Sequence, residues 1–400
     1  MRHFSLPYDL QDQGKKHGTI VINQSINQSI NQSINQSINQ SINQSKLILA
    51  LLLSLPALNA QAEVRYSITD LGTLDGLSSS AKAINDLGQI VGTVDTISGA
   101  RNAFIYSNGQ LTELGQFGGI DISPSKINNS GQITGYVFDS IDIVHGFLYT
   151  NGQSVDIGVS GQSVFANGIN NHGQVVGTDL TTVDGFLYAN GVFVNTGINT
   201  NAGFFDINDN GQITGYMKFA NGEYHAFSYA NGQTVDLGTL GGTGSNGRDI
   251  NNVGQIVGDF YWYGDDFNFV HRAFLWDNGV MTGLGTLGGD FSNASAINDN
   301  GEVVGYSGIS NGDPHAFFYS NGVMTDLNTL IAFDSGWVLR FANGINNSGQ
   351  IVGSGINPEG FSRAFLLTPV AAVPVPGGFL LMGTGLLGLF GVKRNTRKLV

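Results

Sequence analysis

The chain has 400 residues, of which 58 are glycine, 12% are charged and none is cysteine. This composition excludes disulfides and thiolate sites, and it favours short strands joined by tight turns over helices, which glycine destabilises. Between Glu63 and Pro376 there are 28 acidic and 9 basic residues, a balance of −19 (9 − 28). Such a body repels a phosphate backbone, so no binding to nucleic acid is expected.

Residues 1–45 contain a low-complexity tract. Ile22 to Ser45 is six perfect copies of Ile-Asn-Gln-Ser, which a repeated ATCA tetranucleotide encodes when it is read in triplets. A DNA microsatellite is the simplest explanation, so we expect this segment to be non-structural and to build no core. Either translation starts near Lys46, or slippage of the tract switches the reading frame on and off.

Residues 46–62 have the form of a secretory signal peptide. Lys46 is followed by the apolar run LILALLLSLPAL, and the small residues Ala60 and Ala62 stand where a signal peptidase would cut before Glu63. A buried core helix is the poorer alternative, because the chain offers no partner helix. The sequence therefore predicts export.

Residues 63–369 are organised by one phrase, which recurs seven times: Ile-Asn, two residues, Gly, Gln or Glu, an apolar pair and Gly. The copies begin at Ile84, Ile127, Ile169, Ile207, Ile250, Ile297 and Ile345. Their asparagines are 38 to 48 residues apart, a period typical of solenoids and propellers.

Each unit reads as four strands. In the first unit we expect these at Ala81–Asn85, Gln89–Asp95, Arg101–Ser107 and Gln110–Gln116. The last two are joined by Asn-Gly, a strong hairpin signal, which occurs at Asn108, Asn151, Asn190, Asn231, Asn278 and Asn321. We therefore predict an all-β fold, a seven-bladed β-propeller of four-stranded antiparallel blades, followed by a C-terminal apolar helix.

The two ends of the repeat region complement each other. Tyr66–Leu74 matches the fourth strand at Thr234–Leu240, whereas the last unit has a third strand, Ser362–Leu367, and no fourth. The N-terminal strand is therefore predicted to complete the last blade and to remove its exposed edge.

Three phrases recur in the repeats in longer form: Asp-Leu-Gly-Thr-Leu-Gly-Gly from Asp236, Ala-Ile-Asn-Asp-Asn-Gly-Glu-Val-Val-Gly from Ala296 and His-Ala-Phe-Phe-Tyr from His315. They resemble the HAF family of extracellular repeats. Some copies depart from the pattern, with Asn102 and Asp184 in place of the histidine. The resemblance covers roughly Tyr66 to Leu367 and implies export and a repeat fold, but no activity.

Residues 370–400 form a linker, an apolar segment and a basic tail. A Val-Pro-Val-Pro motif precedes sixteen uncharged, mostly apolar residues, 377–392, and a basic cluster follows. As a helix the apolar stretch is about 24 Å long, so basic residues would have to snorkel for it to span a ~30 Å hydrocarbon core. The positions that carry this pattern are Val373, Pro374, Pro376, Lys393 and Arg394.

This order of elements resembles the PEP-CTERM sorting signal of Gram-negative bacteria. The resemblance implies an inner-membrane precursor, cleavage by an exosortase-like processing enzyme, and release to the cell surface or polysaccharide matrix. Val375 stands where the family name has Glu, and a permanent membrane anchor is the alternative interpretation.

Most recurrent polar and aromatic residues have structural explanations. The histidines are expected to bond the backbone of a neighbouring blade, and the asparagines of the Ile-Asn phrase are expected to cap turns. One phenylalanine per unit is expected between blades, at Phe104, Phe147, Phe186, Phe227, Phe274, Phe317 and Phe365. Asp86, Asp209 and Asp299 suggest a cation site, but no loop has the spacing of a calcium hand, so no metal or cofactor is predicted.

A ligand site is better sought where the repeat is interrupted. The insertion from Asp259 to Val270 contains six aromatic residues and three carboxylates. Its rings could stack on pyranose faces while its carboxylates bond hydroxyls; the alternative is packing on its own blade. The predicted ligand residues are Tyr261, Trp262, Tyr263, Asp265 and Asp266.

No catalytic motif stands out, and adjacent Asp265 and Asp266 would point to opposite faces of a strand. The predicted function is therefore that of an exported cell-surface or exopolysaccharide-matrix protein with a non-catalytic binding or structural role. The alternatives are a secreted glycan-active hydrolase or lyase, and a spacer without a ligand. The expected partners are signal peptidase, the exosortase-like enzyme and extracellular polysaccharide.

Overall fold

The computed structural model describes residues 28–44, 65–115, 117, 119–140, 143–158, 163–194, 196–198, 201–263 and 269–370. The chain divides into two compact units, Met1–Glu63 and Val64–Val400. Residues 28–44 form a helix that is exposed along its whole length, where the sequence predicts no regular structure. The difference has a local cause: the tract lacks glycine and proline, and its four-residue period lines up the isoleucines on one stripe.

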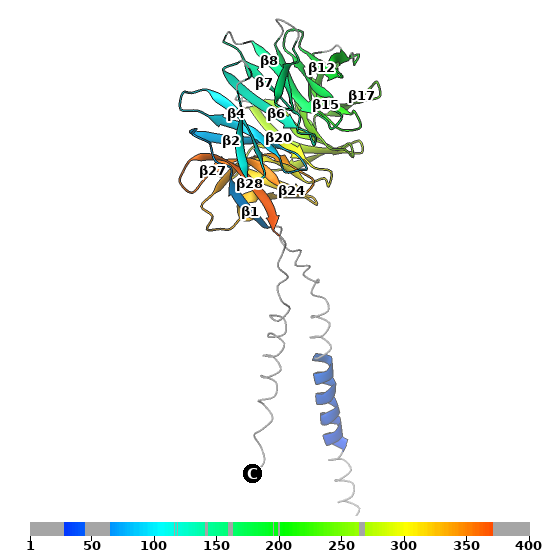
Figure 1. The fold of residues 1–400 in the computed structure, drawn as a ribbon. Helices are drawn as coiled ribbons and strands as arrows, with labels where there is room; N and C mark the ends of the chain where they lie inside the picture. Colours follow the sequence, from blue (N-terminus) through cyan, green and yellow to red (C-terminus); the bar gives the residue numbers. More distant parts are fainter. Residues whose placement is uncertain are drawn as a thin grey trace, which may run out of the picture. The chain divides into compact units, whose positions relative to one another are not determined.

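The second unit consists of antiparallel strands (Figure 1) and one 3-10 turn, η1 (Leu327–Thr329). The first sheet holds β2 (Ser78–Ile84), β3 (Ile90–Asp95), β4 (Arg101–Ser107), β5 (Gln110–Gly115), β6 (Asp121–Ile127), β7 (Ile133–Phe138), β8 (Val144–Thr150) and β9 (Gln153–Asp156). The second holds β10 (Val164–Ile169), β11 (Val175–Asp179), β12 (Asp184–Ala189) and β13 (Val192–Val194). The third holds β14 (Ala202–Ile207), β15 (Ile213–Lys218), β16 (Tyr224–Ala230) and β17 (Gln233–Gly238).

The fourth sheet holds β18 (Gly244–Ile250), β19 (Ile256–Tyr263), β20 (Phe269–Asp277) and β21 (Val280–Gly285). The fifth holds β22 (Ser292–Ile297), β23 (Val303–Gly308), β24 (Pro314–Ser320) and β25 (Val323–Asp326). The sixth holds β26 (Val338–Ile345), β27 (Ile351–Ile356), β28 (Ser362–Val370) and β1 (Arg65–Asp70).

The eight-stranded sheet contains two four-stranded antiparallel groups, β2 to β5 and β6 to β9. A single parallel bridge, Arg101 with Asp121, joins them. In every group but the last, consecutive strands pair as hairpins, and in the last group β26, β27 and β28 do so while β1 takes the fourth place. The four-stranded antiparallel repeat predicted from the sequence is thus confirmed.

The Ile-Asn phrase builds the first hairpin turn of each group. In the first copy, Asn85 Oδ1 accepts hydrogen bonds from the backbone N–H of Leu87 at 3.1 Å and of Gln89 at 2.9 Å. The Asn-Gly turns have φ near +50° at each predicted asparagine, the left-handed geometry that such two-residue hairpins require. Local sequence therefore sets both turns.

The glycine that closes each copy of the phrase permits a close approach of strands. A Cβ on Gly215 of β15 would lie 1.9 Å from the carbonyl oxygen of Gly203 on β14. No side chain fits there, which explains why glycine stands at this position.

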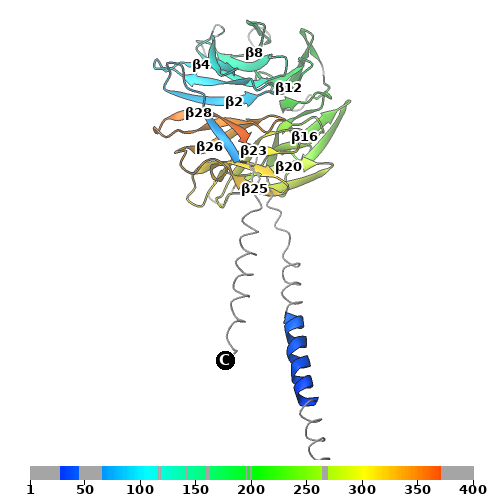
Figure 2. The same ribbon diagram turned by 60° about the horizontal axis from the view of Figure 1, so that its bottom comes forward.

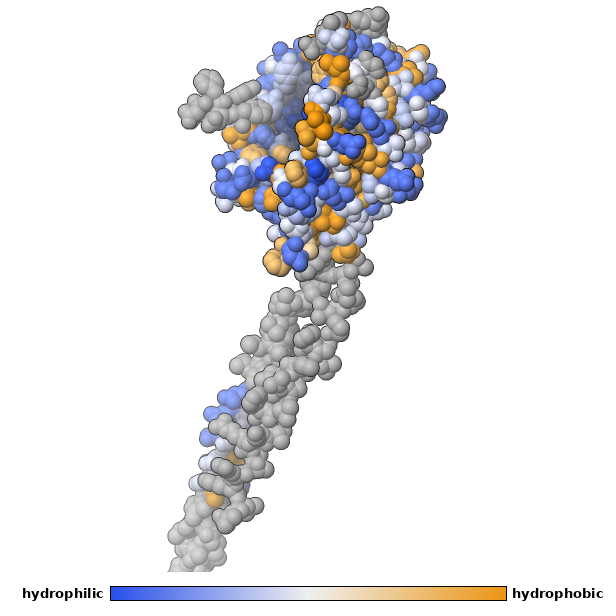
Figure 3. Space-filling model, turned by 60° about the vertical axis from the view of Figure 1, so that its left-hand side comes forward, coloured by the Kyte–Doolittle hydropathy of each residue, from blue (hydrophilic) through white to orange (hydrophobic). Residues whose placement is uncertain are grey.

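The core lies between sheets. The predicted phenylalanines are all buried, with side chains 0–9% exposed, at Phe104, Phe147, Phe186, Phe227, Phe274, Phe317 and Phe365. Buried serines link neighbouring groups: Ser245 Oγ accepts from Ala226 N at 2.8 Å and donates to Gly238 O at 2.6 Å. The surface of the described part mixes hydrophilic and hydrophobic residues in small patches (Figure 3).

The N-terminal strand lies where the sequence predicts. β1 pairs with β28 in antiparallel register from Arg65↔Val370 to Asp70↔Phe365, and Figures 1 and 2 both show the two strands side by side. Tyr66 is buried against the core of the last sheet. No helix in the described ranges is both long and apolar enough to cross a membrane; the predicted segment 377–392 lies outside those ranges.

Candidate binding site at the centre of the repeat

The seven Ile-Asn turns are joined side by side through their first asparagine. In each case Nδ2 donates to the backbone carbonyl of the asparagine in the next copy, at 2.9–3.1 Å. We call this set the turn ring: Asn85, Asn128, Asn170, Asn208, Asn251, Asn298 and Asn346. The last bond runs from Asn346 back to Asn85, so the series returns to its start.

A second series of seven bonds runs beside the first, one residue further along each turn. The backbone N–H of each residue donates to the side-chain Oδ1 of its neighbour in the next copy, at 2.8–2.9 Å. The members are Asp86, Asn129, Asn171, Asp209, Asn252, Asp299 and Asn347. These contacts occupy Asp86, Asp209 and Asp299, the aspartates that suggest a cation site in the sequence. Within the described residues no group of three or more histidines or acids has metal-binding geometry.

The turn ring surrounds a central cavity of about 160 Å³. Its walls come from the inner strands of all seven groups and from the amide side chains of the turns. Because each amide is fixed by its neighbour, the polar groups of this cavity are preorganised.

Three charged side chains meet in this cavity, and we call them the charged cluster. Lys126 Nζ, from β6, lies 3.4 Å from Asp206 Oδ2 of β14 and forms a closer ion pair with Asp249 of β18. Both carboxylates also accept backbone N–H groups of the next inner strand: Asp206 from Ile250 at 3.3 Å and Asp249 from Ile297 at 2.7 Å. The cluster therefore ties together strands that are far apart in the sequence.

Burial and the attraction between opposite charges shift the pKa values of the three groups in opposite directions. Burial raises the pKa of Asp206 well above its ordinary value, despite the attraction of Lys126. Burial alone would also raise the pKa of Asp249, but Lys126 and the hydrogen bonds lower it. Burial would lower the pKa of Lys126, and the two aspartates together raise it instead. A Lys126–Asp249 ion pair, with Asp206 the more easily protonated of the two acids, is consistent with all three directions.

This cluster was not predicted from the sequence, although a signal for it exists. The residue directly before each Ile-Asn phrase is small in four copies, at Ala83, Gly168, Ala296 and Gly344, and charged in three, at Lys126, Asp206 and Asp249. Alignment of the seven copies would have shown opposite charges at one repeat position, which is where side chains from different inner strands meet.

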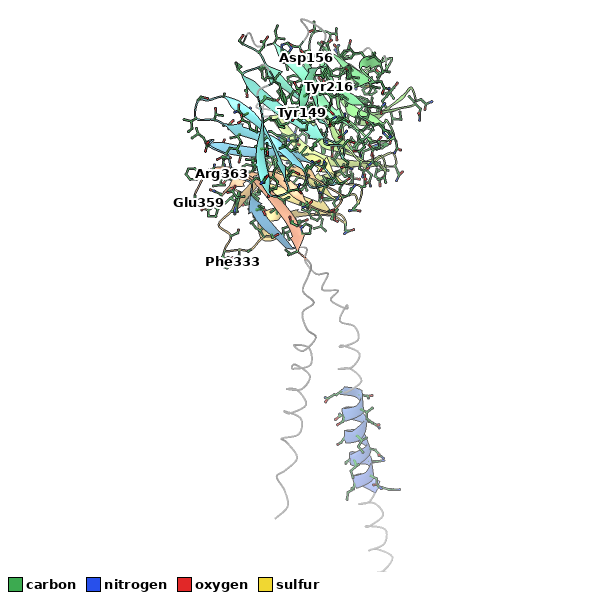
Figure 4. The ribbon with its side chains drawn as sticks, viewed as in Figure 1. Tyr149, Asp156, Tyr216, Phe333, Glu359 and Arg363 are labelled. Carbon is green, nitrogen blue, oxygen red and sulfur yellow. The ribbon has the colours of Figure 1, made fainter. Side chains whose placement is uncertain are left out.

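The histidines mostly bond within their own sheet rather than to a neighbour. Three of them place Nδ1 2.7–2.9 Å from an aspartate eleven residues later: His145 with Asp156, His225 with Asp236 and His315 with Asp326. Asp156 is labelled in Figure 4. Only His271 meets the prediction, with Nδ1 3.1 Å from the carbonyl oxygen of Ser292 in the next sheet. The prediction was wrong for the other three because an outer-strand aspartate lies closer.

The predicted aromatic site is an extended hairpin, β19 with β20. Trp262 stacks on Phe260 with ring centroids 5.9 Å apart, and the Arg272 guanidinium lies 5.5 Å from the Trp262 ring. Tyr261 instead covers Gly244, where an added Cβ would lie 2.3 Å from its hydroxyl oxygen. Neighbouring residues of a strand point to opposite faces, so Tyr261 and Trp262 do not share one platform. A ligand role for Trp262 stays a prediction.

Other predicted positions lie outside the described residues. Tyr263 ends β19, whereas the predicted ligand carboxylates, the signal-cleavage alanines and the sorting motif are not described. These are Asp265, Asp266, Ala60, Ala62, Val373, Pro374, Pro376, Lys393 and Arg394.

Four-stranded antiparallel sheets whose innermost turns encircle a central cavity define the β-propeller class. No protein-family model matches the chain, and no curated protein matches it significantly. Its structure is similar to a puromycin-hydrolyzing peptidase of Mycobacterium tuberculosis, at 9% identity and TM-score 0.47, over 78% of this chain and 54% of that one.

Two other solved structures are also similar. TolB of Acinetobacter baumannii matches at 12% identity and TM-score 0.36, over 74% of this chain and 65% of that one. A lectin of Aleuria aurantia matches at 11% identity and TM-score 0.30, over 62% and 94% respectively. The chain thus spans about half the length of the peptidase and two thirds of TolB. Likenesses at this level assign no activity.

Proposed function

We propose that the repeat region is a closed seven-bladed β-propeller. The eight-stranded sheet counts as two blades, because only one parallel bridge joins its two antiparallel groups. Both series of turn contacts have seven members and return to the first copy. β1 supplies the fourth strand of the last blade, which fastens the two ends of the repeat region together.

The function we propose is non-catalytic binding of extracellular polysaccharide, or a structural role in the matrix that contains it. The observation that carries this proposal is the preorganised polar cavity inside the turn ring. The turn-ring amides use their N–H groups and oxygens within the protein, so a polyhydroxylated ligand would hydrogen-bond to the side chains of the second series, which line the same cavity. Such a set of fixed amides and carboxylates suits hydrogen bonding better than proton transfer. The aromatic hairpin with Trp262 adds a surface of the kind that sugar rings stack on.

The location we propose is the cell surface or extracellular matrix. The signal peptide, with cleavage after Ala62, supports export. The Val-Pro-Val-Pro motif and basic tail support an inner-membrane precursor, from which an exosortase-like enzyme releases a form that ends near Pro376. The HAF resemblance, which extends over the whole repeat region, supports the same location.

One experiment separates the candidate functions. Purified mature protein is applied to a glycan array, and in parallel it is incubated with the same polysaccharides in a reducing-sugar release assay. Binding without release is the expected result. Release of sugar would establish a hydrolase or lyase, and neither binding nor release would establish a spacer.

A further inference from the structure

The inner strand of each propeller repeat contains a β-bulge at an equivalent place. The register shifts in β2, β6, β10, β14, β18, β22 and β26 by one residue, two positions before the Ile-Asn phrase. The extra residues are Lys82, Ser125, Asn167, Phe205, Arg248, Ser295 and Asn343. Bulges commonly redirect a side chain next to a functional site, and here two of the redirected side chains are basic.

Arg248 is held in place but keeps free donors. Its Nε lies 2.7 Å from Asp259 Oδ1, and its guanidinium lies 5.9 Å from the Phe205 ring. Asn293 also donates to Asp259 at 3.0 Å, so the carboxylate that orients Arg248 is itself fixed. The two terminal nitrogens of Arg248 make no hydrogen bond to the described residues, and its side chain is 42% exposed.

Lys82 is the second basic residue at a bulge. It lines the central cavity together with Asn343, and among the described residues it has no hydrogen bond or ion pair. Only nine basic residues occur between Glu63 and Pro376, against 28 acidic ones. The cavity itself is also lined by Lys126 and five aspartates, so Lys82 and Arg248, which stands at the equivalent bulge of β18, supply the basic groups that are not neutralised by a direct ion pair or that keep free donors.

Half-buried tyrosines on the second strands accompany these basic groups. Tyr136 contacts Phe165 with ring centroids 4.7 Å apart, Tyr216 contacts Phe205 at 5.4 Å, and Tyr306 contacts Phe341 at 5.2 Å. Tyr216 is labelled in Figure 4. The three phenol groups form no hydrogen bond within the described part. Burial raises the pKa of Tyr216 and Tyr306, so these phenols stay protonated as donors.

We propose that Lys82, Arg248, Phe205, Tyr136, Tyr216 and Tyr306, which we call the collar, bind a short acidic oligosaccharide of uronic acid units. The free fork of Arg248 suits a sugar carboxylate, and Lys82 suits the carboxylate of another unit. The tyrosine rings offer faces for the pyranose, and their hydroxyls offer donors to its oxygens. A body with a balance of −19 repels a long polyanion, so the collar takes a chain end or a short oligomer.

This inference rests on the proposed function, because it names a ligand class for a polysaccharide-binding propeller. The test uses trigalacturonic acid as the probe and maltotriose as its neutral counterpart, with dissociation constants measured by calorimetry on the mature protein. Lys82→Gln removes the unpaired charge, and Tyr306→Phe removes one phenol group. Lys218→Gln is the charge-matched control, because Lys218 is exposed and outside the collar.

We expect the parent to bind trigalacturonic acid and to discriminate against maltotriose. Lys82→Gln should weaken the binding of trigalacturonic acid by about tenfold, the equivalent of one charge-assisted hydrogen bond. The Lys218→Gln variant should bind it with the affinity of the parent. Lys82 makes no internal bond, so its variant should melt like the parent; if it does not fold, Tyr306→Phe should still weaken binding.

Three results would overturn the inference. If the parent binds neutral glycans but not trigalacturonic acid, the collar assignment fails and the proposed function stands. If no glycan of any kind binds, both fail. If Lys218→Gln loses as much affinity as Lys82→Gln, the acidic sugar binds somewhere other than the collar.

Discussion

The charged cluster gives a sharp test of how the inner strands are held together. Either Asp206 or Asp249 alone can neutralise Lys126, because both reach its ammonium. Asp206→Asn should cost less than about 1 kcal/mol, since Asp249 still pairs with Lys126 and the new amide oxygen can still accept from Ile250 N. Asp249→Asn should cost about 1.5–3 kcal/mol, the value of a hydrogen bond to a charged group, because Asp206 remains to pair with Lys126.

The double variant Asp206→Asn/Asp249→Asn should lose more stability than the sum of the two single losses. With both carboxylates gone, Lys126 keeps its charge in a site where its side chain is only 29% exposed, and an unpaired buried charge costs about 3–5 kcal/mol. We therefore expect the double variant to exceed the sum of the single losses by about 1–3 kcal/mol. Urea denaturation at pH 7 measures all four proteins, with exposed Asp75→Asn as the matched control. Strict additivity would refute the idea that the two acids share one lysine.

The same variants have a defined pH dependence. The pKa of Asp206 is raised in the folded protein, so its contribution to stability is present at acidic pH and is lost as the pH rises through that raised pKa. Asp206→Asn removes this dependence, and its stability relative to the parent should therefore improve with increasing pH. The pKa of Asp249 is lowered, so its contribution is lost only as the pH falls through that lowered pKa. An unchanged difference between parent and Asp206→Asn from pH 5 to 9 would contradict this assignment.

Four further predictions concern separate features. Deletion of Arg65–Asp70 should lower the melting temperature by roughly 5–10 °C, as expected for a loss of a few kcal/mol; a variant that melts like the parent would show that β1 does not fasten the ring. Gly215→Ala should destabilise by at least about 1–3 kcal/mol because its Cβ meets the Gly203 carbonyl, whereas Gly283→Ala, whose nearest contact is 3.8 Å, should not. Trp262→Ala should remove ~1–3 kcal/mol of polysaccharide binding with little change in melting; a stability loss of ~3–5 kcal/mol would instead assign the ring to packing. Fractionation with an antibody to the tail should find Lys393 only in the inner membrane, and an intact tail on surface protein would establish a permanent anchor.

The repeat made the sequence unusually informative about local structure. Turn chemistry depends on a few neighbouring residues, so the Ile-Asn and Asn-Gly phrases predicted both hairpin turns and hence the four-stranded groups. The buried Phe104 and its equivalents followed from one aromatic residue at a fixed place in every unit. The missing last strand predicted the pairing of β1 with β28, because an incomplete hairpin at each end can be satisfied only by the other.

The contacts between side chains of different repeats could be identified only in the tertiary structure. Lys126 is 80 residues from Asp206 and 123 from Asp249, so no local sequence pattern pairs them. They meet because the same position of each inner strand lines one cavity. The histidine partners differed from the prediction for a related reason. The strand register pairs Asp156 with Phe147, two residues from His145 on the same face of the sheet, and this brings the Asp156 carboxylate within hydrogen-bond distance of the His145 ring. The sequence determined the turns and strands of each repeat, because these elements form from residues that are adjacent in the chain. The packing of the repeats around a common centre decided which side chains act together, because that depends on distances in space that sequence spacing does not encode.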